Sequence, residues 1–102
     1  MHAIVRRYEG IDTKRTDELT RKVGESLTPR LKKLEGFGGY FLIEADNGVL
    51  SSISLFETSA QADESDKVAK NWISDENFGM ALPNAPKITS GKVVVHSNGV
   101  TA

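Results

Sequence analysis

Hydrophobic and polar residues alternate most clearly in the middle of the chain. Two runs rich in β-branched and aromatic residues, Phe37–Ala45 and Val49–Glu57, flank the sequence Asp46-Asn47-Gly48. Asn and Gly readily adopt the positive φ that a tight hairpin turn requires. This stretch therefore predicts a β-hairpin, and the rest of the chain places one helix and one strand on each side of it.

Each strand of the hairpin is predicted to have one oily face and one mixed face, because successive side chains of a strand point to opposite sides. The oily face comprises Phe37, Phe41, Ile43, Val49, Ile53 and Leu55. The mixed face comprises Tyr40, Leu42, Glu44, Ser52, Ser54 and Phe56. We expect the oily face to pack against helices and the mixed face to be left uncovered by them.

A strand and a helix precede the hairpin. Residues 2–8 alternate, and the side expected to join the mixed face carries Ile4, Arg6 and Tyr8. A long amphipathic helix follows, with apolar residues at three- to four-residue spacing at Leu19, Val23, Leu27, Leu31 and Leu34. Pro29 lacks a backbone N–H, so we expect a kink or break near Glu25–Thr28. Gly36 supplies the left-handed residue that ends the helix.

A second helix and a last strand follow the hairpin. Thr58 and Gln61 have the spacing of a capping box. The inward stripe of this helix is Ala62, Ser65, Val68, Ala69, Trp72, Ile73 and Glu76, and the residues expected to face solvent are Asp63, Glu64, Asp66 and Lys67. We predict a last strand at Lys87–His96, centred on Val93-Val94-Val95.

The order strand, helix, strand, strand, helix, strand predicts an α+β, ferredoxin-like fold. Right-handed crossovers place both helices on one face of a four-stranded antiparallel sheet. We expect a single domain over residues 1–96, with a flexible tail at 97–102. The bare sheet face would be an apolar patch that soluble monomers usually cover. The sequence therefore predicts a homodimer packed sheet face to sheet face, a dimeric α/β barrel.

Composition narrows the partners and the chemistry. The 102 residues carry a net charge of −1, so the chain has no excess of positive charge with which to bind nucleic acid or anionic lipid. No apolar run is long enough to cross a bilayer and no signal peptide is recognisable, so we expect a cytoplasmic protein without nucleic-acid or membrane partners. The absence of cysteine excludes disulfides, thiolate chemistry and cysteine-held metals.

Two segments carry a resemblance to a known family. One is the helix end Pro29-Arg30-Leu31-Lys32-Lys33-Leu34-Glu35-Gly36-Phe37 followed by Tyr40, and the other is the strand end Leu55-Phe56-Glu57-Thr58 leading into a capped helix. In these segments, and in element order over residues 2–96, the chain resembles the small dimeric α/β-barrel proteins related to antibiotic-biosynthesis monooxygenases. That superfamily includes cofactor-independent oxygenases of aromatic polyketides, heme-degrading oxygenases, isomerases and small proteins of other roles.

The resemblance implies a reaction class. Heme-degrading relatives use a histidine on the second helix and an asparagine on the first strand, and this chain has neither in residues 59–77 or 3–7. A heme enzyme is therefore not expected, and neither is a metal. The resemblance favours a monooxygenase-like protein that oxidises a small aromatic or enolisable substrate without any cofactor. The alternative is a non-catalytic dimeric module that binds a small hydrophobic ligand.

Arg6 and Tyr40 are the candidate catalytic residues. Arg6 would pair with a substrate carboxylate or enolate, and Tyr40 would donate or accept a proton once its pKa is shifted. In the structural alternative, Arg6 forms an interface ion pair with Glu44 and the tyrosines pack across the dimer. A closed cavity with a polar group of shifted pKa would favour the enzyme, and a filled barrel with Arg6 and Glu44 paired would favour the module.

The candidate substrate-binding residues are Tyr8, Phe56, Asn71 and Trp72. Trp72 would stack on a ring, or it is a core residue of the second helix. Asn71 would hold a substrate carbonyl, or it is a solvated helix residue. His2 and His96 lie on strands that neighbour each other in this fold, but two imidazoles without a third ligand make a poor metal site, so we expect them to be solvent-exposed.

Overall fold

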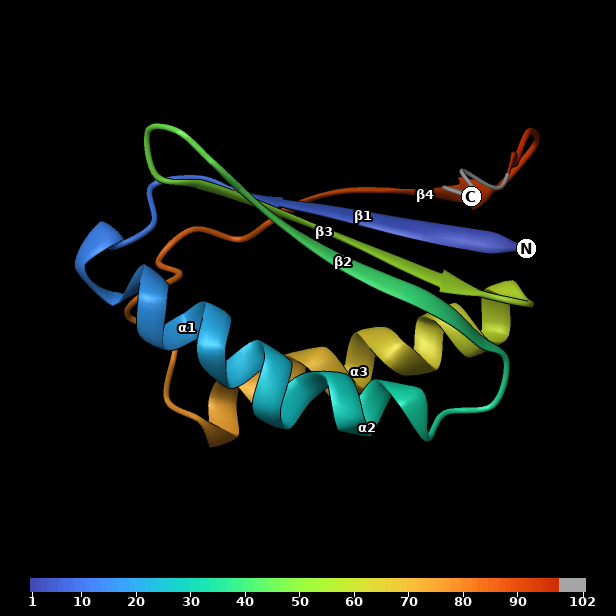
Figure 1. The fold of residues 1–102 in the computed structure, drawn as a ribbon, viewed down its shortest axis with the longest axis horizontal. Coiled ribbons are helices and arrows are strands. Elements are labelled where there is room, and N and C mark those ends of the chain that lie inside the picture. Colours follow the sequence, from blue (N-terminus) through green and yellow to red (C-terminus); the bar gives the residue numbers. More distant parts are fainter. Residues whose placement is uncertain (98–102) are drawn as a thin grey trace, which may run out of the picture.

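The computed structural model describes residues 1–97. Its elements are β1 (His2–Tyr8), η1 (Thr13–Arg15), α1 (Thr16–Lys22), η2 (Val23–Leu27), α2 (Thr28–Lys32), β2 (Phe37–Ala45), β3 (Val49–Phe56), α3 (Ser59–Asp75) and β4 (Lys87–Lys92). The sheet order is β2-β3-β1-β4, and every neighbouring pair is antiparallel. The helices lie together on one side of the sheet (Figure 1). The predicted α+β ferredoxin-like fold is thus confirmed.

The first helical stretch changes type where Pro29 interrupts it. Segment η2 is a π-helix, in which the Thr28 N–H donates to the Val23 carbonyl five residues earlier. The Thr28 hydroxyl donates to the Gly24 carbonyl at 2.7 Å. Pro29 has no N–H to continue the α-helical ladder, and this exchange of partners accommodates it. In place of the expected kink or break near Glu25–Thr28, the chain forms a π-helical turn over Val23–Leu27 and stays helical into α2.

Local signals at the turns and caps are also confirmed. Asn47 and Gly48 have φ of 63° and 70° in the hairpin turn, where Ala45 pairs with Val49. The Thr58 side chain accepts from the Gln61 N–H at 3.2 Å, and the Gln61 side chain accepts from the Thr58 N–H at 3.1 Å. These short-range interactions fix where the hairpin turns and where α3 begins.

The sheet faces are the reverse of those expected. The mixed face lies beneath the helices, and the buried residues on it are Ile4, Arg6, Leu50, Ser52, Ser54 and Phe56. Most of the oily face points away from the helices, with Phe41 57% exposed and Ile43 48% exposed. Phe37 is the exception and packs against the core, because a register shift between Phe37 and Gly39 interrupts the alternation of β2. Strand alternation separates two faces without saying which one the helices cover. Here α1, η2, α2 and α3 supply the apolar side chains that cover the mixed face.

The last strand is shorter than predicted. It ends at Lys92, and one further bond joins the Val93 N–H to the Met1 carbonyl at 2.9 Å. Val94 and Val95 are each 84% exposed. The predicted tail beyond Ser97 lies outside the described residues.

A membrane span requires a helix that is both long and apolar. No helix within residues 1–97 is long and apolar enough to cross a membrane.

Candidate functional site

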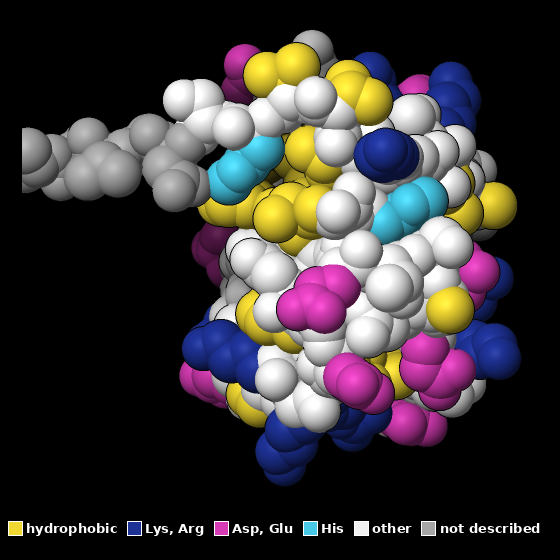
Figure 2. All heavy atoms as spheres, turned by 90° about the vertical axis from the view of Figure 1, so that its right-hand side faces the viewer, with side chains coloured by type: hydrophobic (Ala, Val, Ile, Leu, Met, Phe, Trp, Pro, Cys, Tyr) yellow, Lys and Arg dark blue, Asp and Glu magenta, His cyan; other side chains and the backbone are white. Residues whose placement is uncertain are grey.

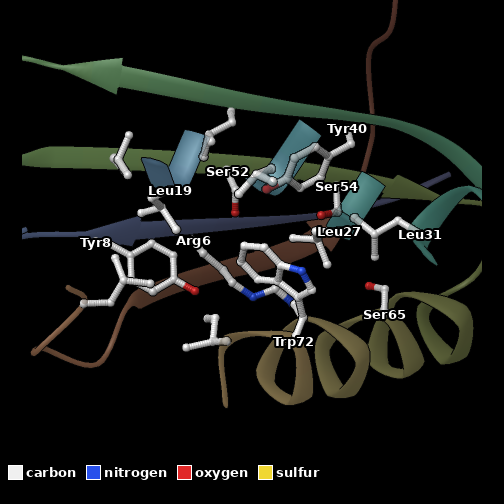
Figure 3. A pocket seen from close by; sticks show the side chains of 16 residues that line it. Arg6, Tyr8, Leu19, Leu27, Leu31, Tyr40, Ser52, Ser54, Ser65 and Trp72 are labelled. Carbon is white, nitrogen blue, oxygen red and sulfur yellow. The ribbon is translucent and has the colours of Figure 1, made fainter. Parts of the chain in front are cut away.

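A cavity of about 40 Å³ lies between the mixed sheet face and the helices (Figure 3). Its apolar wall comes mainly from the helices and includes Leu19, Val23, Leu27, Leu31 and Ile73. Its polar side chains are Arg6, Tyr8, Tyr40, Ser52, Ser54, Ser65 and Trp72. Ser52 on β3 lies directly opposite Arg6 on β1 and Leu42 on β2. The three strands therefore present these side chains to one space.

Arg6 is the charged group of the cavity and is only 4% exposed. Its Nε donates to Asp66 Oδ1 at 3.0 Å, and its Nη2 donates to the same oxygen. Lys70 Nζ lies 3.1 Å from Asp66 Oδ2. Within residues 1–97, the side-chain hydrogen bonds of Arg6 use Nε and Nη2 and leave Nη1 unused. The guanidinium is therefore held from one side and keeps donors free on another.

This pairing corrects two expectations. Asp66 was expected to face solvent but reaches inward, and Glu44 is exposed instead of pairing with Arg6. The reason is that Arg6 lies on the helix-covered face, where α3 is the nearest source of a carboxylate. Partial burial alone would raise the pKa of Asp66, but hydrogen bonds from Arg6 and Lys70 and their charges outweigh it and hold that pKa below its usual value.

Both tyrosines of the chain line the cavity, and both are held neutral. Burial raises the pKa of Tyr40 to about 12, the neighbouring Tyr8 adds to the effect, and Arg6 and the Ser52 hydroxyl partly offset it. Burial also raises the pKa of Tyr8, although the Arg6 charge lowers it in part. Near neutral pH the two phenols are hydrogen-bond donors, and Tyr40 is not a proton acceptor.

Trp72 is a core residue, as one of its two interpretations predicted, and its stacking on a ligand ring stays a prediction. It is 1% exposed, and its indole ring stacks on Phe78 with centroids 5.5 Å apart. Its Nε1–H donates to Ser26 Oγ at 3.0 Å, which ties α3 to η2. Trp72 is therefore a core residue and at the same time a wall of the cavity.

The structure does not bring the remaining candidates to this cavity. Phe56 is fully buried and packs edge-to-face against Phe37, with centroids 5.7 Å apart, in a separate part of the core. Asn71 is exposed on α3 and is not among the cavity residues.

The histidines also lie away from the cavity. Their two side chains are well separated on one end of the molecule, with hydrophobic side chains between them (Figure 2). His2 is half-buried, in contrast to the expected exposure, and His96 is exposed. No group of three or more potential metal-ligating side chains gathers within the part of the chain that is described.

Two residues important to the site were not anticipated from the sequence. Asp66 fixes Arg6, and Ser65 contributes a hydroxyl that donates to the Ala62 carbonyl at 2.6 Å. Ser65 was assigned to the inward stripe of the helix, but only as a packing position. Asp66 lies at the edge of that stripe and four residues before Lys70, a spacing that signals an ion pair on a helix.

Two surface hollows share walls with the cavity. One, of about 400 Å³, lies over Gly24 and shares Val23, Tyr40 and Leu42 with it. The other, of about 200 Å³, lies beside α3 and shares Arg6 and Tyr8, among others. A volume of 40 Å³ holds only a few water molecules. A ligand the size of one ring must therefore displace side chains that separate the cavity from a hollow.

Solved structures share this fold over nearly the whole chain. NE2512 from Nitrosomonas europaea, of unknown function, is 14% identical with a TM-score of 0.75, covering 98% of this chain and 95% of its own. A Caulobacter crescentus protein provisionally named an antibiotic biosynthesis monooxygenase is 18% identical with a TM-score of 0.74, covering 92% and 90%. A Bordetella bronchiseptica protein with the same provisional name is 12% identical with a TM-score of 0.73, covering 92% and 97%.

The chain has the fold of the antibiotic biosynthesis monooxygenases. The resemblance carried by the Pro29–Phe37 and Leu55–Thr58 segments is thereby confirmed for the fold. No protein-family model matches the sequence, and no curated protein does. At identities this low, the antibiotic biosynthesis monooxygenase fold establishes an architecture and not a reaction.

Proposed function

We propose that the cavity binds a small, largely apolar molecule that carries an anionic or carbonyl oxygen, and that the protein oxidises this molecule with dioxygen and no cofactor. The observation that carries the proposal is Arg6, a buried cation fixed by Asp66 whose Nη1 is not used in that pairing and which lines a mostly apolar cavity. Asp66 compensates the buried charge of Arg6, so the argument for a ligand oxygen rests on the charged donor that this pairing leaves unused beside the cavity.

The cavity residues suit the recognition of an oxygen atom on a ring or an enol. The Arg6 guanidinium would donate charge-assisted hydrogen bonds to it, and the neutral phenols of Tyr8 and Tyr40 would add donors. Aliphatic side chains and the Trp72 indole would hold the apolar part of the molecule. Such an arrangement stabilises an enolate or phenolate relative to its neutral form.

An enolate is the species that reacts with dioxygen without a cofactor. In the overall reaction a CH₂ group becomes C=O, one oxygen atom of O₂ enters the product, and the other leaves as water with the two hydrogens. The proton must be lost easily by the substrate itself, because Asp66 is bound to Arg6 and Tyr40 is protonated at neutral pH. This requirement favours substrates such as phenols and 1,3-diketones.

The alternative function is a non-catalytic module that binds a small hydrophobic ligand. It is favoured by the structural bonds that Arg6 and Trp72 already form, to Asp66 and to Ser26. Oxygen consumption separates the two functions. The chain would be incubated with one-ring phenols and cyclic 1,3-diketones, and dissolved oxygen and product would be followed together.

For the enzyme we expect oxygen uptake equal to product formed, lost in Arg6→Met, reduced in Tyr40→Phe, and unchanged in Arg7→Met. Arg7 is the matched control, because it neighbours Arg6 on β1 but is exposed on the opposite face. Binding without oxygen uptake would support the module. Neither binding nor uptake across the panel would overturn both.

The proposal includes a second copy of the chain on the outer sheet face. The apolar side chains on that face are Val5, Phe41, Ile43, Val49, Ile53 and Leu55. A contiguous apolar surface of this kind is usually covered in a soluble protein, and a two-fold axis lets one surface cover itself. The expected interface is thus the oily face, not the mixed face that the sequence pattern suggested.

A further inference from the structure

Serines occupy positions of the core where aliphatic residues would pack better. Ser52 and Ser54 lie on β3, an interior strand, and are 4% and 2% exposed. Ser65 lies on the inward stripe of α3 and is 1% exposed. Interior strand positions facing helices usually carry Val, Ile or Leu. The small serines help to leave the cavity open, and they line it with hydroxyl groups.

Ser54 is the least explained of the three. Its neighbours across the strands are Ile4 and Tyr40. Its hydroxyl forms no side-chain hydrogen bond to any residue of 1–97, whereas that of Ser65 donates to Ala62 and retains its acceptor lone pairs. No fully buried side-chain oxygen or nitrogen in residues 1–97 lacks a hydrogen-bond partner, so the Ser54 hydroxyl keeps a little accessible surface, and Ser54 lines the cavity. The hydroxyl is therefore available to a ligand.

The two hydroxyls lie at a distinct end of the cavity. Figure 3 shows Ser54 and Ser65 on one side of Trp72 and Tyr8 on the other. Arg6 faces Ser52 across the strands, and Ser54 lies two residues further, about 7 Å along β3. Tyr8 thus lies at one end of the cavity, Arg6 lies beside Trp72 in the middle, and Ser54 and Ser65 lie at the other end (Figure 3).

We propose that Ser54 and Ser65 form a second polar subsite, which selects a ring-sized ligand bearing a hydroxyl or carbonyl group at the end opposite the oxygen held by Arg6. This inference rests on the proposed function, because it assumes that Arg6 holds one end of the ligand. Ser54 would donate or accept, and Ser65 would accept. The subsite would reject an isosteric ligand whose far end is a methyl group.

Two isosteric probes test the subsite. 4-Hydroxybenzoate and 4-methylbenzoate carry the same carboxylate for Arg6 and differ only in the opposite substituent. We expect the wild type to bind the hydroxy acid about 5- to 10-fold tighter by calorimetry, the size expected for one hydrogen bond. Ser54→Ala should abolish this preference and leave the Kd of 4-methylbenzoate unchanged. Ser51→Ala, on the opposite face of β3, should behave as the wild type.

A measurement without ligand accompanies the titrations. Because the Ser54 hydroxyl takes part in no side-chain hydrogen bond within residues 1–97, Ser54→Ala should melt at the same temperature as the wild type or higher. Equal binding of the two acids by the wild type, or a preference that survives in Ser54→Ala, would overturn the subsite alone. A large fall in the melting temperature of Ser54→Ala would make the serine structural and also overturn it. Failure of both acids to bind the wild type would overturn the subsite together with the proposed function.

Discussion

Asp66 Oδ1 accepts hydrogen bonds from both Nε and Nη2 of Arg6, and so joins α3 to β1 across the floor of the cavity. The pair lies at the border between the cavity and the hollow beside α3. Its asymmetry underlies the proposed function, because Nε and Nη2 of the guanidinium are occupied and Nη1 is not. The same asymmetry makes the pair a structural element whose removal can be measured.

Asp66→Asn should reduce the free energy of unfolding by about 1–3 kcal/mol. The substitution leaves the buried Arg6 cation without a counter-charge, and the partial exposure of Asp66 keeps the loss below that of a fully buried pair. Urea denaturation gives the value. Asp63→Asn, an exposed carboxylate on the same helix, is the matched control and should change little. Equal stabilities of the two variants would contradict a structural role for the pair.

The tyrosines should titrate late. The chain has two tyrosines, both in the cavity, so tyrosinate absorbance reports on this site alone. At pH 10, where an unperturbed tyrosine is half ionised, the folded chain should show less than half of its tyrosinate signal, and Tyr40 should ionise near pH 12. If half of the tyrosinate signal appeared at pH 10 while circular dichroism showed an intact fold, the burial of the two tyrosines would be ruled out.

The same shift predicts alkaline destabilisation. The folded-state pKa of Tyr40 lies above its unfolded value, so its contribution to stability is fully present below pH 10 and is lost as pH rises toward 12. The free energy of unfolding should therefore fall over this range. Tyr40→Phe should flatten the fall, and an unchanged slope in that variant would assign the effect to other groups.

Local features of the fold were predictable because their causes are local. Asn47 and Gly48 determine the hairpin turn, Thr58 determines the start of α3, and Pro29 determines the π-helical turn, each within a few residues of sequence. The covered face of the sheet was not predictable in this way. Alternation along β2 and β3 defines two faces, and which one lies beneath the helices depends on packing between distant segments.

Part of the candidate site was predictable because it depends on local alternation, and part was not because it depends on a distant segment. Arg6, Tyr8 and Tyr40 share a face by alternation, and the sequence therefore grouped them correctly. Asp66 was missed because it comes from α3, sixty residues from Arg6, and a charged residue beside other charges is typical of a solvated helix face. Ser54 stands out as a core hydroxyl only once its face is known to lie beneath the helices.

The helix cap offers a test of the fold. Thr58→Ala removes the side chain that accepts from the Gln61 N–H and should lower the free energy of unfolding by about 1 kcal/mol. Ser59→Ala, one residue further, should have a smaller effect, because Ser59 is exposed and no side-chain bond to it is part of the cap. Chemical denaturation of the two variants provides the comparison, and equal losses would contradict the capping role.

The outer sheet face predicts the state of association. The wild type should elute with twice its chain mass of 11.1 kDa in light scattering, and Phe41→Lys should be a monomer. Met80→Lys is the control, since Met80 is 87% exposed but lies in the loop after α3. A monomeric wild type, or a Phe41→Lys variant that stays dimeric, would contradict an interface on this face.

The most direct test of the central claim uses Trp72, the single tryptophan of the chain and a wall of the cavity. Its emission would be followed during titration with 4-hydroxybenzoate. We predict a saturable change in the wild type and in Arg7→Met, with binding weakened at least about tenfold in Arg6→Met, the loss expected for charge-assisted hydrogen bonds. Equal affinity in Arg6→Met and wild type, or no saturable change at all, would contradict a ligand site built on Arg6.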